Sequence, residues 1–415
     1  MEKLHKIGFS KLTSLEAAID MLFSRIKINS SEEVEIRNVL NRILAMDVIS
    51  KIDIPPFDRS AMDGYAIKAE DSFGASPKNP KKIKLIGKIE IGESAKLKIN
   101  KNEAIRISTG APIPEGSDAV IKIEDTEIEN DIIYLYTSLV PGKNVSRKGE
   151  DFKSGIKVLS KGIELKAEHI ALLTSLGYEK VSVHIKPEIS IFSSGDELIE
   201  PGEALKPGKI YNSNTSMISA LVKLYGGRVL RGESVRDDKE SIRIRLLESS
   251  KDSQIIIFTG GTSVGTKDYL PEIMKESGLI LTHGVAQRPG APVLIGSLGD
   301  TLIFCLPGTP VAAYVSFLKI VGPTIRKMLG SIIIDPRVEI MAKISKDVPV
   351  SSLGFVHYLR VSLKRFLEGI IANPIKLKGS GVISSLTSSD GIVEILPHQE
   401  GLKKGDNVIV KLMPH

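Results

Sequence analysis

The feature that most constrains this chain is a glycine-rich loop between an apolar run and a helical pattern. Residues 254–258 are rich in β-branched side chains and predict a buried parallel strand. The loop that follows reads Thr259-Gly260-Gly261-Thr262-Ser263-Val264-Gly265-Thr266-Lys267-Asp268, and 269–277 predicts a helix that stops before Gly278. Such a strand, loop and helix N-terminus favour phosphate, because glycines let the backbone approach and free N–H groups attract anions.

The loop does not match the common nucleotide-binding signatures. Thr266 stands where a Walker loop has its lysine, Lys267 comes one position late, and the dinucleotide fingerprint is absent. A tight connection with Asp268 as helix N-cap is the alternative reading. Because a carboxylate beside a phosphate is repulsive unless a cation lies between them, the loop predicts a Mg²⁺–phosphate ligand if it binds anything.

Composition limits the class of protein. A length of 415 residues suggests about two to four domains. The single cysteine, Cys305, excludes an internal disulfide framework and favours a reducing, cytoplasmic location, with a core role for the thiol. We expect no membrane span and no signal peptide. The net charge of +6 suits anionic substrates, whereas the absence of tryptophan and of dense Lys/Arg blocks disfavours nucleic acid.

The first half of the chain predicts helices and then a β domain. Residues 13–16 resemble a capping box and begin an amphipathic helix, and a second helix is expected over about 37–46. A proline pair opens the polar loop 54–67, which is rich in directional side chains. Short strands and turns over 83–136 predict a small all-β domain. A further helix is expected near 166–176.

Residues 188–330 alternate strands and helices, which predicts a three-layer α/β domain with a mainly parallel sheet. The predicted strands are 189–192, 228–230, 255–258, 293–295 and 302–304. The predicted helices are 215–225, 238–248, 269–277 and 310–328. Residues 335–415 again predict short strands and turns, and hence a second all-β domain. Where the residues before about 28 pack stays open.

Polar motifs follow the predicted parallel strands, where ligands bind in such sheets. They are 193–198, 236–238, the glycine-rich loop and 306–310, and together they predict a functional cleft. The loops also carry the carboxylates Asp63, Asp151, Glu197, Asp237 and Asp268, and the cations Arg288 and Arg360. Hard carboxylate oxygens and arginine forks suit Mg²⁺-assisted chemistry on a phosphoanhydride. No Ser/His/Asp set and no zinc pattern is evident, and we expect His283, His357 and His398 to be structural or exposed.

Six motifs together resemble the molybdopterin molybdenumtransferases, the MoeA family related to the C-terminal domain of gephyrin. The motifs are Pro55 to Ala66, Ser108-Thr109-Gly110-Ala111-Pro112, Arg147-Lys148-Gly149-Glu150-Asp151, Ser194-Gly195-Asp196-Glu197-Leu198, Thr259 to Gly265, and Leu306-Pro307-Gly308-Thr309-Pro310-Val311. They occur in family order over essentially the whole chain. The first and fifth are long enough to be specific.

The resemblance implies a reaction and an assembly. The family takes adenylylated molybdopterin and molybdate (or tungstate), hydrolyses the phosphoanhydride with Mg²⁺, releases AMP and leaves molybdenum on the dithiolene. It also implies an elongated, four-domain homodimer, with the molybdopterin adenylyltransferase and apo-molybdoenzymes as further partners. The implied divisions are a linker/helical domain over 1–50 and 142–180, a small β domain over 51–141, the molybdopterin-binding α/β domain over 181–330 and a C-terminal β domain over 331–415.

Matching positions assign expected roles. Asp63, Asp151, Asp237 and Asp268 would be catalytic, with Asp237 and Asp268 on the metal and Asp63, Thr109 and Asp151 acting across the dimer interface. The other expected binding residues are Thr109, Glu197, Gly260, Gly261, Ser263, Gly265, Arg288, Pro289, Gly308, Arg360 and Ser385. Within that set, Arg288, Arg360 and Ser385 would line the molybdate pocket.

The chain departs from the family pattern beside the expected oxyanion pocket. The family's Lys-Pro-Gly-Lys-Pro is here Arg288-Pro289-Gly290-Ala291-Pro292, and Thr309 and Ala312 replace an asparagine and a serine. These changes leave the choice between molybdate and tungstate open. Two other functions also stay open: a non-catalytic dimeric scaffold, which has no need of the loop carboxylates, and an adenylyltransferase-like nucleotide-binding protein, which the additional β domains disfavour.

Overall fold

The computed structural model describes residues 12–94, 96–260, 269–375 and 381–414. The chain divides into two compact units, which are described separately. Unit 1 comprises Met1–Ala45, Gly162–Lys166 and Lys180–His415, and unit 2 comprises Met46–Lys161 and Ala167–Glu179. Among the described residues, no helix combines the length and apolarity that a bilayer crossing requires.

Unit 2 is built around a six-stranded sheet in the order β7-β4-β6-β5-β9-β8. The strands are β4 (Gly64–Ile67), β5 (Lys81–Ile89), β6 (Glu103–Ile107), β7 (Ala119–Lys122), β8 (Thr126–Glu129) and β9 (Ile132–Leu135). Only β5 and β6 pair in parallel within this sheet. Apolar residues are buried on both faces of the sheet, with Ile121 in one core cluster and Ile105 in the other, and the all-β prediction for this region is confirmed.

The remainder of unit 2 is short paired segments and one helix. Strand β2 (Val48–Ile49) pairs with β11 (Lys157–Leu159), and β3 (Arg59–Ser60) pairs with β10 (Val145–Ser146). The turns η2 (Ala69–Ser72) and η3 (Ile123–Asp125) are 3₁₀ helices, and α3 (Ala167–Ser175) lies within the predicted helix.

The N-terminal helix α2 (Leu15–Phe23) packs on the α/β domain of unit 1. The Ser14 hydroxyl caps it by accepting a hydrogen bond from the Ala17 amide at 3.2 Å. The predicted capping box over 13–16 is therefore one residue out of register, because Ser14 is the N-cap and the third helical position is Ala17 rather than Glu16. Ala18 and Leu22 are buried in the same core cluster as the sheet residue Ile255. The described residues before 28 therefore pack on the α/β domain, which the sequence left open.

The second predicted helix, over about 37–46, is wrong. The structure has only a 3₁₀ turn, η1 (Ile36–Asn38), and Asn41 has a left-handed φ of 61°. The Leu44 amide bonds to the Ile163 carbonyl and the Ala45 amide to the Ser182 carbonyl. Val39, Ile43 and Leu44 are buried at a spacing that resembles a helix, but tertiary hydrogen bonds hold the backbone extended. The neighbouring β1 (Ser31–Glu35) pairs with β12 (Lys180–His184).

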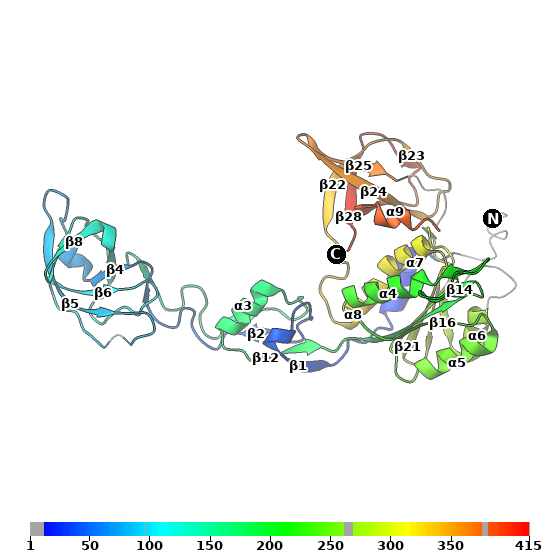
Figure 1. Cartoon of the computed structure of the whole chain (residues 1–415), viewed down its shortest axis with the longest axis horizontal. Helices are drawn as coiled ribbons and strands as arrows, with labels where there is room; N and C mark the ends of the chain where they lie inside the picture. Colours follow the sequence, from blue (N-terminus) through cyan, green and yellow to red (C-terminus); the bar gives the residue numbers. More distant parts are fainter. Residues whose placement is uncertain (1–11, 95, 261–268, 376–380, 415) are drawn as a thin grey trace. The chain divides into compact units, whose positions relative to one another are not determined.

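The α/β domain contains a six-stranded sheet in the order β16-β13-β17-β21-β20-β18 (Figure 1). The strands are β13 (Glu188–Ser194), β16 (Arg228–Val235), β17 (Ile255–Thr259), β18 (Leu279–His283), β20 (Leu294–Leu298) and β21 (Thr301–Leu306). The first four strands in the order are parallel to one another. Strand β20 is antiparallel to its neighbour β21, and β18 is antiparallel to β20. The mainly parallel sheet is thus confirmed. A two-stranded pair, β14 (Leu198–Ile199) and β15 (Ile210–Tyr211), lies outside it.

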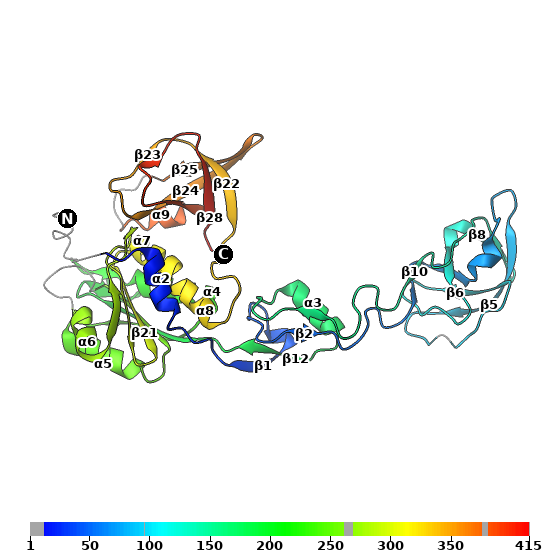
Figure 2. The same ribbon diagram turned by 180° about the vertical axis from the view of Figure 1, so that it is seen from behind.

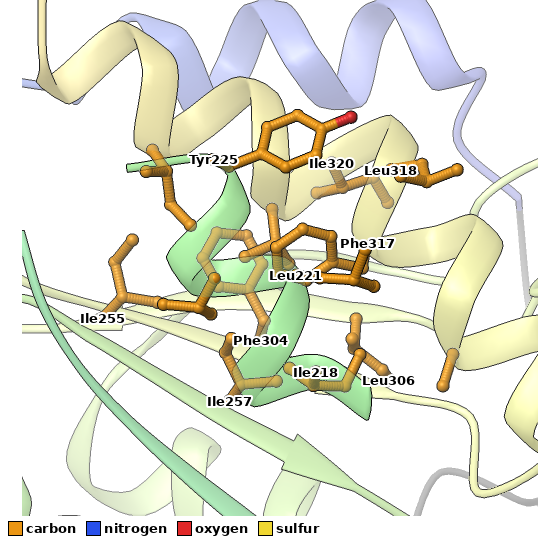
Figure 3. Packing of buried hydrophobic residues seen from close by; sticks show 14 of the residues in the cluster. Ile218, Leu221, Tyr225, Ile255, Ile257, Phe304, Leu306, Phe317, Leu318 and Ile320 are labelled. Carbon is orange, nitrogen blue, oxygen red and sulfur yellow. The ribbon is translucent and has the colours of Figure 1, made fainter. Parts of the chain in front are cut away.

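Helices cover both faces of this sheet (Figures 1 and 2). One face carries α4 (Ser213–Leu224), α7 (Pro310–Ser316) and α8 (Gly322–Met328); the other carries α5 (Lys239–Ser249) and α6 (Tyr269–Ser277). The turn Phe317–Val321, labelled η4, is π-helical and joins α7 to α8. Ile255 and Ile257 pack with Ile218 and Leu221 of α4 (Figure 3). Ile256 and Phe258 pack against α5 and α6 on the other face, as strand alternation requires.

The C-terminal sheet has the order β19-β24-β25-β22-β28-β26, and an additional β24–β26 pairing closes it. Its strands are β19 (Gln287–Arg288), β22 (Glu339–Ile344), β24 (Val356–Phe366), β25 (Gly369–Pro374), β26 (Gly391–Ile395) and β28 (Asn407–Leu412). Strand β23 (Val348–Pro349) pairs with β27 (Gly401–Leu402), and α9 is Ser384–Thr387. The second predicted all-β region is confirmed, and β19 brings residues of the α/β domain into its sheet.

Candidate functional site

The parallel strands of the α/β domain end at one edge, at a point where the chain reverses direction across the sheet. From β13 the chain first adds β16 on one side and then β17 and β21 on the other. Crevices at such switch points are where doubly wound sheets bind ligands. Buried hydroxyls tie the edge together: Ser193 Oγ lies 2.7 Å from Thr215 Oγ1 and 2.8 Å from Thr259 Oγ1.

Two of the predicted strand-end motifs meet directly. The Ser194 hydroxyl donates to Asp237 Oδ1 at 2.5 Å, which joins the end of β13 to the end of β16. The neighbouring Asp238 instead caps α5, because its carboxylate accepts from the amide and hydroxyl of Ser241. The amide hydrogen bond from Ser241 is the main reason that the pKa of Asp238 is lowered. Asp237 is therefore the aspartate whose carboxylate lies at the carboxyl end of β13.

Gly260 allows the close approach of two loops. Its φ is +94°, and a Cβ at this position would lie 2.4 Å from the Ser194 carbonyl oxygen. A Cβ on Gly308 would lie 3.3 Å from Gly260 Cα, and the Gly260 amide bonds to the Leu306 carbonyl. The two predicted binding glycines, Gly260 and Gly308, thus lie side by side. Cys305, on β21, is buried, as the sequence predicts.

Asn214, at the start of α4, is a buried polar residue that the sequence analysis missed. Its Nδ2 donates to the Gly308 carbonyl at 2.7 Å, and its Oδ1 has no hydrogen-bond partner within 12–94, 96–260, 269–375 and 381–414. The signal was the polar run 212–215 at the beginning of a predicted helix. The amide therefore offers an acceptor at the strand-end edge.

The other residues predicted at the strand ends of the α/β domain are either outside the described residues or exposed. Gly261, Ser263, Gly265 and Asp268 lie outside the described residues. Glu197 is exposed, and its carboxylate folds back over Gly195, where an added Cβ would meet it at 2.7 Å. No hydrogen bond between Glu197 and Asp237 is found among the described residues.

Unit 2 brings together two of its three predicted residues. The Asp63 carboxylate accepts a hydrogen bond from the Thr109 amide at 2.7 Å, so these residues lie side by side on exposed loops. Asp151 is also exposed, and its amide donates to the Ile54 carbonyl at 3.0 Å. This bond ties the Asp151 loop to the proline-pair segment rather than to Asp63.

Arg288, Pro289 and Arg360 line one cavity of about 550 Å³ within unit 1. Arg288 lies over the Phe355 ring at 4.4 Å and donates from Nη1 to Ser351 Oγ at 3.2 Å. These contacts fix the guanidinium of a half-buried residue. Most other lining residues are apolar, including Val348, Val350, Leu359 and Ile395.

The Arg360 guanidinium is buried, and no ion pair to it is found among the described residues. The residue is 2% exposed, and Nε and Nη1 have no hydrogen-bond partner in the part of the chain that the structure describes. Burial lowers its pKa to about 10, so Arg360 remains protonated at neutral pH. Because an uncompensated buried cation is costly, the site favours an anionic ligand.

Ser385 and the two substituted alanines, Ala291 and Ala312, are not among the residues that line the cavity. Ser385 is buried, donates to the Val382 carbonyl at 2.7 Å, and is not among the residues that line the cavity. Ala291 accepts the amides of Val285 and Val293 through its carbonyl, and the Ala312 carbonyl would lie 3.4 Å from a Cβ on Gly290. Ala291 therefore supports the Arg288–Pro289 loop through its carbonyl, and the Ala312 carbonyl lies close to Gly290.

Comparison with known proteins identifies the family. Residues 13–177 match the "MoeA N-terminal region (domain I and II)", 190–327 the "Probable molybdopterin binding domain", and 345–413 the "MoeA C-terminal region (domain IV)". The chain belongs to the MoeA family. Relatives in this family are named as molybdopterin molybdenumtransferases, which are enzymes of molybdenum cofactor biosynthesis. The resemblance drawn from the motifs is confirmed.

Individual relatives span the full length. A molybdopterin biosynthesis protein of Methanocaldococcus jannaschii is 36% identical over 97% of this chain and 98% of its own. The molybdopterin molybdenumtransferase of Staphylococcus epidermidis is 35% identical over 93% and 94%. The crystal structure of a MoeA protein from Pyrococcus horikoshii OT3 is 34% identical, with a TM-score of 0.85 over 97% of this chain and all of that one (100%).

Proposed function

We propose that this MoeA-family chain inserts molybdate, or tungstate, into adenylylated molybdopterin and releases AMP in a Mg²⁺-dependent reaction. The observation that carries the proposal is the buried guanidinium of Arg360, whose Nε and Nη1 have no hydrogen-bond partner among the described residues, in a cavity shared with Arg288. An oxyanion there would supply the charge and hydrogen-bond acceptors that Arg360 lacks among the described residues. The apolar remainder of the lining strengthens that interaction by excluding water.

The strand-end crevice suits the phosphoanhydride. Asp237 and, by family position, Asp268 would hold Mg²⁺ together with phosphate oxygens. When bound, the ion would neutralise charge on the phosphates. Gly260 and Gly308 let the loops after β17 and β21 approach each other and the end of β13 closely, and the Ser194 hydroxyl orients Asp237.

We further propose that the active form is a homodimer. By family resemblance, Asp63, Thr109 and Asp151 of one copy would act on the substrate held by the α/β domain of the other. The Asp63–Thr109 hydrogen bond supports a shared role for these two residues. A cytoplasmic location is proposed with it, in keeping with a single cysteine.

Calorimetric titration of molybdate and then tungstate, with AMP and Mg²⁺ present, tests the oxyanion site. We expect saturable binding that Arg360→Ala abolishes. Arg365→Ala is the matched control, because Arg365 lies on the same strand but is exposed and does not line the cavity. Binding of AMP without either oxyanion would refute the transferase function and favour a nucleotide-binding paralogue or scaffold.

A further inference from the structure

Two neighbouring strands of the C-terminal sheet separate and leave an open edge. Strands β22 and β25 lie side by side (Figures 1 and 2) but pair at only two positions, Lys343 with Ile371 and Ile344 with Ala372. On its other side β22 pairs with β28 at five positions. The first residues of β22, Glu339–Ala342, therefore have no strand partner on the β25 side among the described residues.

Backbone groups of β22 point into the gap between these strands. The Ile344 amide bonds to the Asp406 carbonyl on the β28 side, whereas the Ser345 amide bonds to the Ala372 carbonyl of β25. Because successive peptide groups of a strand point to opposite sides, the amide and carbonyl of Met341 point to the β25 side, as the Ser345 amide does. No pairing with β25 reaches Met341 in the part of the chain that the structure describes. An exposed strand edge of this kind can accept a further strand.

A cavity of about 630 Å³ lies where the two strands separate. Its walls come from β22, from the β24–β25 hairpin and from Asn407 of β28. Exposed apolar side chains line it: Met341 is 59% exposed, Phe366 is 56% exposed, and Leu367 at the tip of the hairpin is fully exposed. Apolar side chains gathered at a hollow of this volume are typical of a surface that binds a partner.

The cavity is flanked by positive charge. Lys343 lines it, and Lys364 stands opposite Ile371 of β25, so that the two lysines lie on one face of the sheet. Both are exposed and neither forms an ion pair with another described residue, whereas Lys411 of the same sheet contacts three carboxylates. Among the described residues that line the cavity, Glu368 is the only carboxylate. The surface therefore suits an acidic partner.

We propose that this edge binds an extended segment of another protein, apolar at its centre and acidic at its ends. The segment adds a strand to β22 through the backbone of Met341, places apolar side chains against Phe366 and Leu367, and directs its carboxylates to Lys343 and Lys364. Backbone pairing supplies affinity for any extended chain, whereas the apolar hollow and the two cations select its side chains. This surface is separate from the oxyanion cavity, because no described residue lines both.

Fluorescence anisotropy with the full chain tests the proposal, and its probe is the labelled peptide Glu-Glu-Val-Ile-Val-Glu-Glu. We expect saturable binding that weakens about tenfold when the amides of the three apolar residues are N-methylated, because methylation removes the donors of an added strand. The peptide Lys-Lys-Val-Ile-Val-Lys-Lys should bind more weakly by a similar factor, because its charges repel the lysines. These two comparisons leave the protein unchanged, so they hold even if a variant fails to fold.

Variants of the chain then locate the binding surface. Lys343→Glu and Phe366→Ser should each weaken binding of the acidic peptide about tenfold. Lys206→Glu and Leu205→Ser are the matched controls, because both residues are exposed in unit 1 and neither lines the cavity. We expect the controls to bind the peptide with the wild-type affinity.

Three results would overturn the proposal. The first is the absence of saturable binding of the acidic peptide to the wild-type protein. The second is an affinity that N-methylation, Lys343→Glu and Phe366→Ser all leave unchanged, which would mean binding elsewhere and without an added strand. The third is a smaller oligomer of Phe366→Ser than of the wild type in analytical ultracentrifugation, which would make this edge a contact between copies of the chain.

Discussion

At the scale of single residues, two adjacent aspartates after β16 have different tasks. Asp238 satisfies the N-terminus of α5, and Asp237 accepts the Ser194 hydroxyl at the strand-end crevice. The half-buried Asp237 thus meets the end of β13, whereas the exposed Asp238 serves the helix. This difference comes from the backbone direction at the start of the helix, and the Asp-Asp sequence does not reveal it.

We predict opposite results for the two alanine variants. Asp237→Ala should lower the rate of AMP release about 100-fold with little change in stability, because it removes a proposed metal ligand. Asp238→Ala should lower the free energy of unfolding by about 1 kcal/mol through the lost cap and leave AMP release near the wild-type rate. Rate assays and urea denaturation of both proteins check this; a fully active Asp237→Ala would contradict the assignment.

Gly260 provides a second residue-scale test. Gly260→Ala combines an unfavourable φ with a Cβ 2.4 Å from the Ser194 carbonyl, whereas Gly202→Ala has a similar φ of +100° and no atom within 4 Å. We expect Gly202→Ala to cost about 1 kcal/mol and Gly260→Ala clearly more, with lower AMP affinity. Equal costs in thermal unfolding would show that the contact with Ser194 relaxes freely.

The binding residues were only partly predictable from sequence. The resemblance placed Arg288 and Arg360 in one pocket although they are distant along the chain, and the structure brings both to one cavity. That Arg360 lacks a partner among the described residues could not be foreseen, because it depends on the packing of two domains. Packing within each domain leaves Ser385 bonded to Val382, off the cavity lining, and brings Asn214 to Gly308.

At the scale of elements, strong periodicity gave the best predictions. The helix over 269–277 has the predicted bounds, since a buried strand precedes it and Gly278 follows. The helix expected over about 37–46 failed because its apolar residues are buried by an extended backbone that bonds to Ser182 and Ile163. A helix and an irregular segment would both bury apolar residues at this spacing, and the tertiary hydrogen bonds determine which of the two structures forms.

The segment before β22 carries a pH-dependent contribution to stability. Partial burial opposes ionisation of Asp335, but hydrogen bonds from Arg337 and the charge of Lys411 outweigh it and hold the pKa at about 2, below the ordinary 3.8. Since the folded-state pKa is lowered, this stability is present above about pH 4 and is lost as the pH falls towards 2.

We therefore expect Asp335→Asn to lower the free energy of unfolding at pH 7 by about 1–2 kcal/mol. The difference from the wild type should shrink between pH 4 and pH 2. Denaturant unfolding at a series of pH values measures it. A difference that is constant down to pH 2 would contradict the role given to the ionised carboxylate.

At the scale of the whole molecule, the proposed dimer makes a prediction about mixed variants. If unit 2 of one copy acts on the α/β domain of the other, a dimer of Asp63→Ala with Asp237→Ala contains one site with neither substitution. Random exchange of subunits should then restore about a quarter of the wild-type AMP release, although each variant alone is inactive. No recovery in a mixture shown to contain mixed dimers would place both residues in a site within one chain.

The most direct test of the central claim is AMP release from adenylylated molybdopterin by the purified protein with Mg²⁺, measured before and after molybdate is added. The account predicts little AMP until molybdate or tungstate is present, and then a single turnover that Arg360→Ala and Asp237→Ala each suppress. AMP release at the same rate without an oxyanion, or in the Arg360→Ala protein, would contradict the claim that this chain couples phosphoanhydride cleavage to metal insertion.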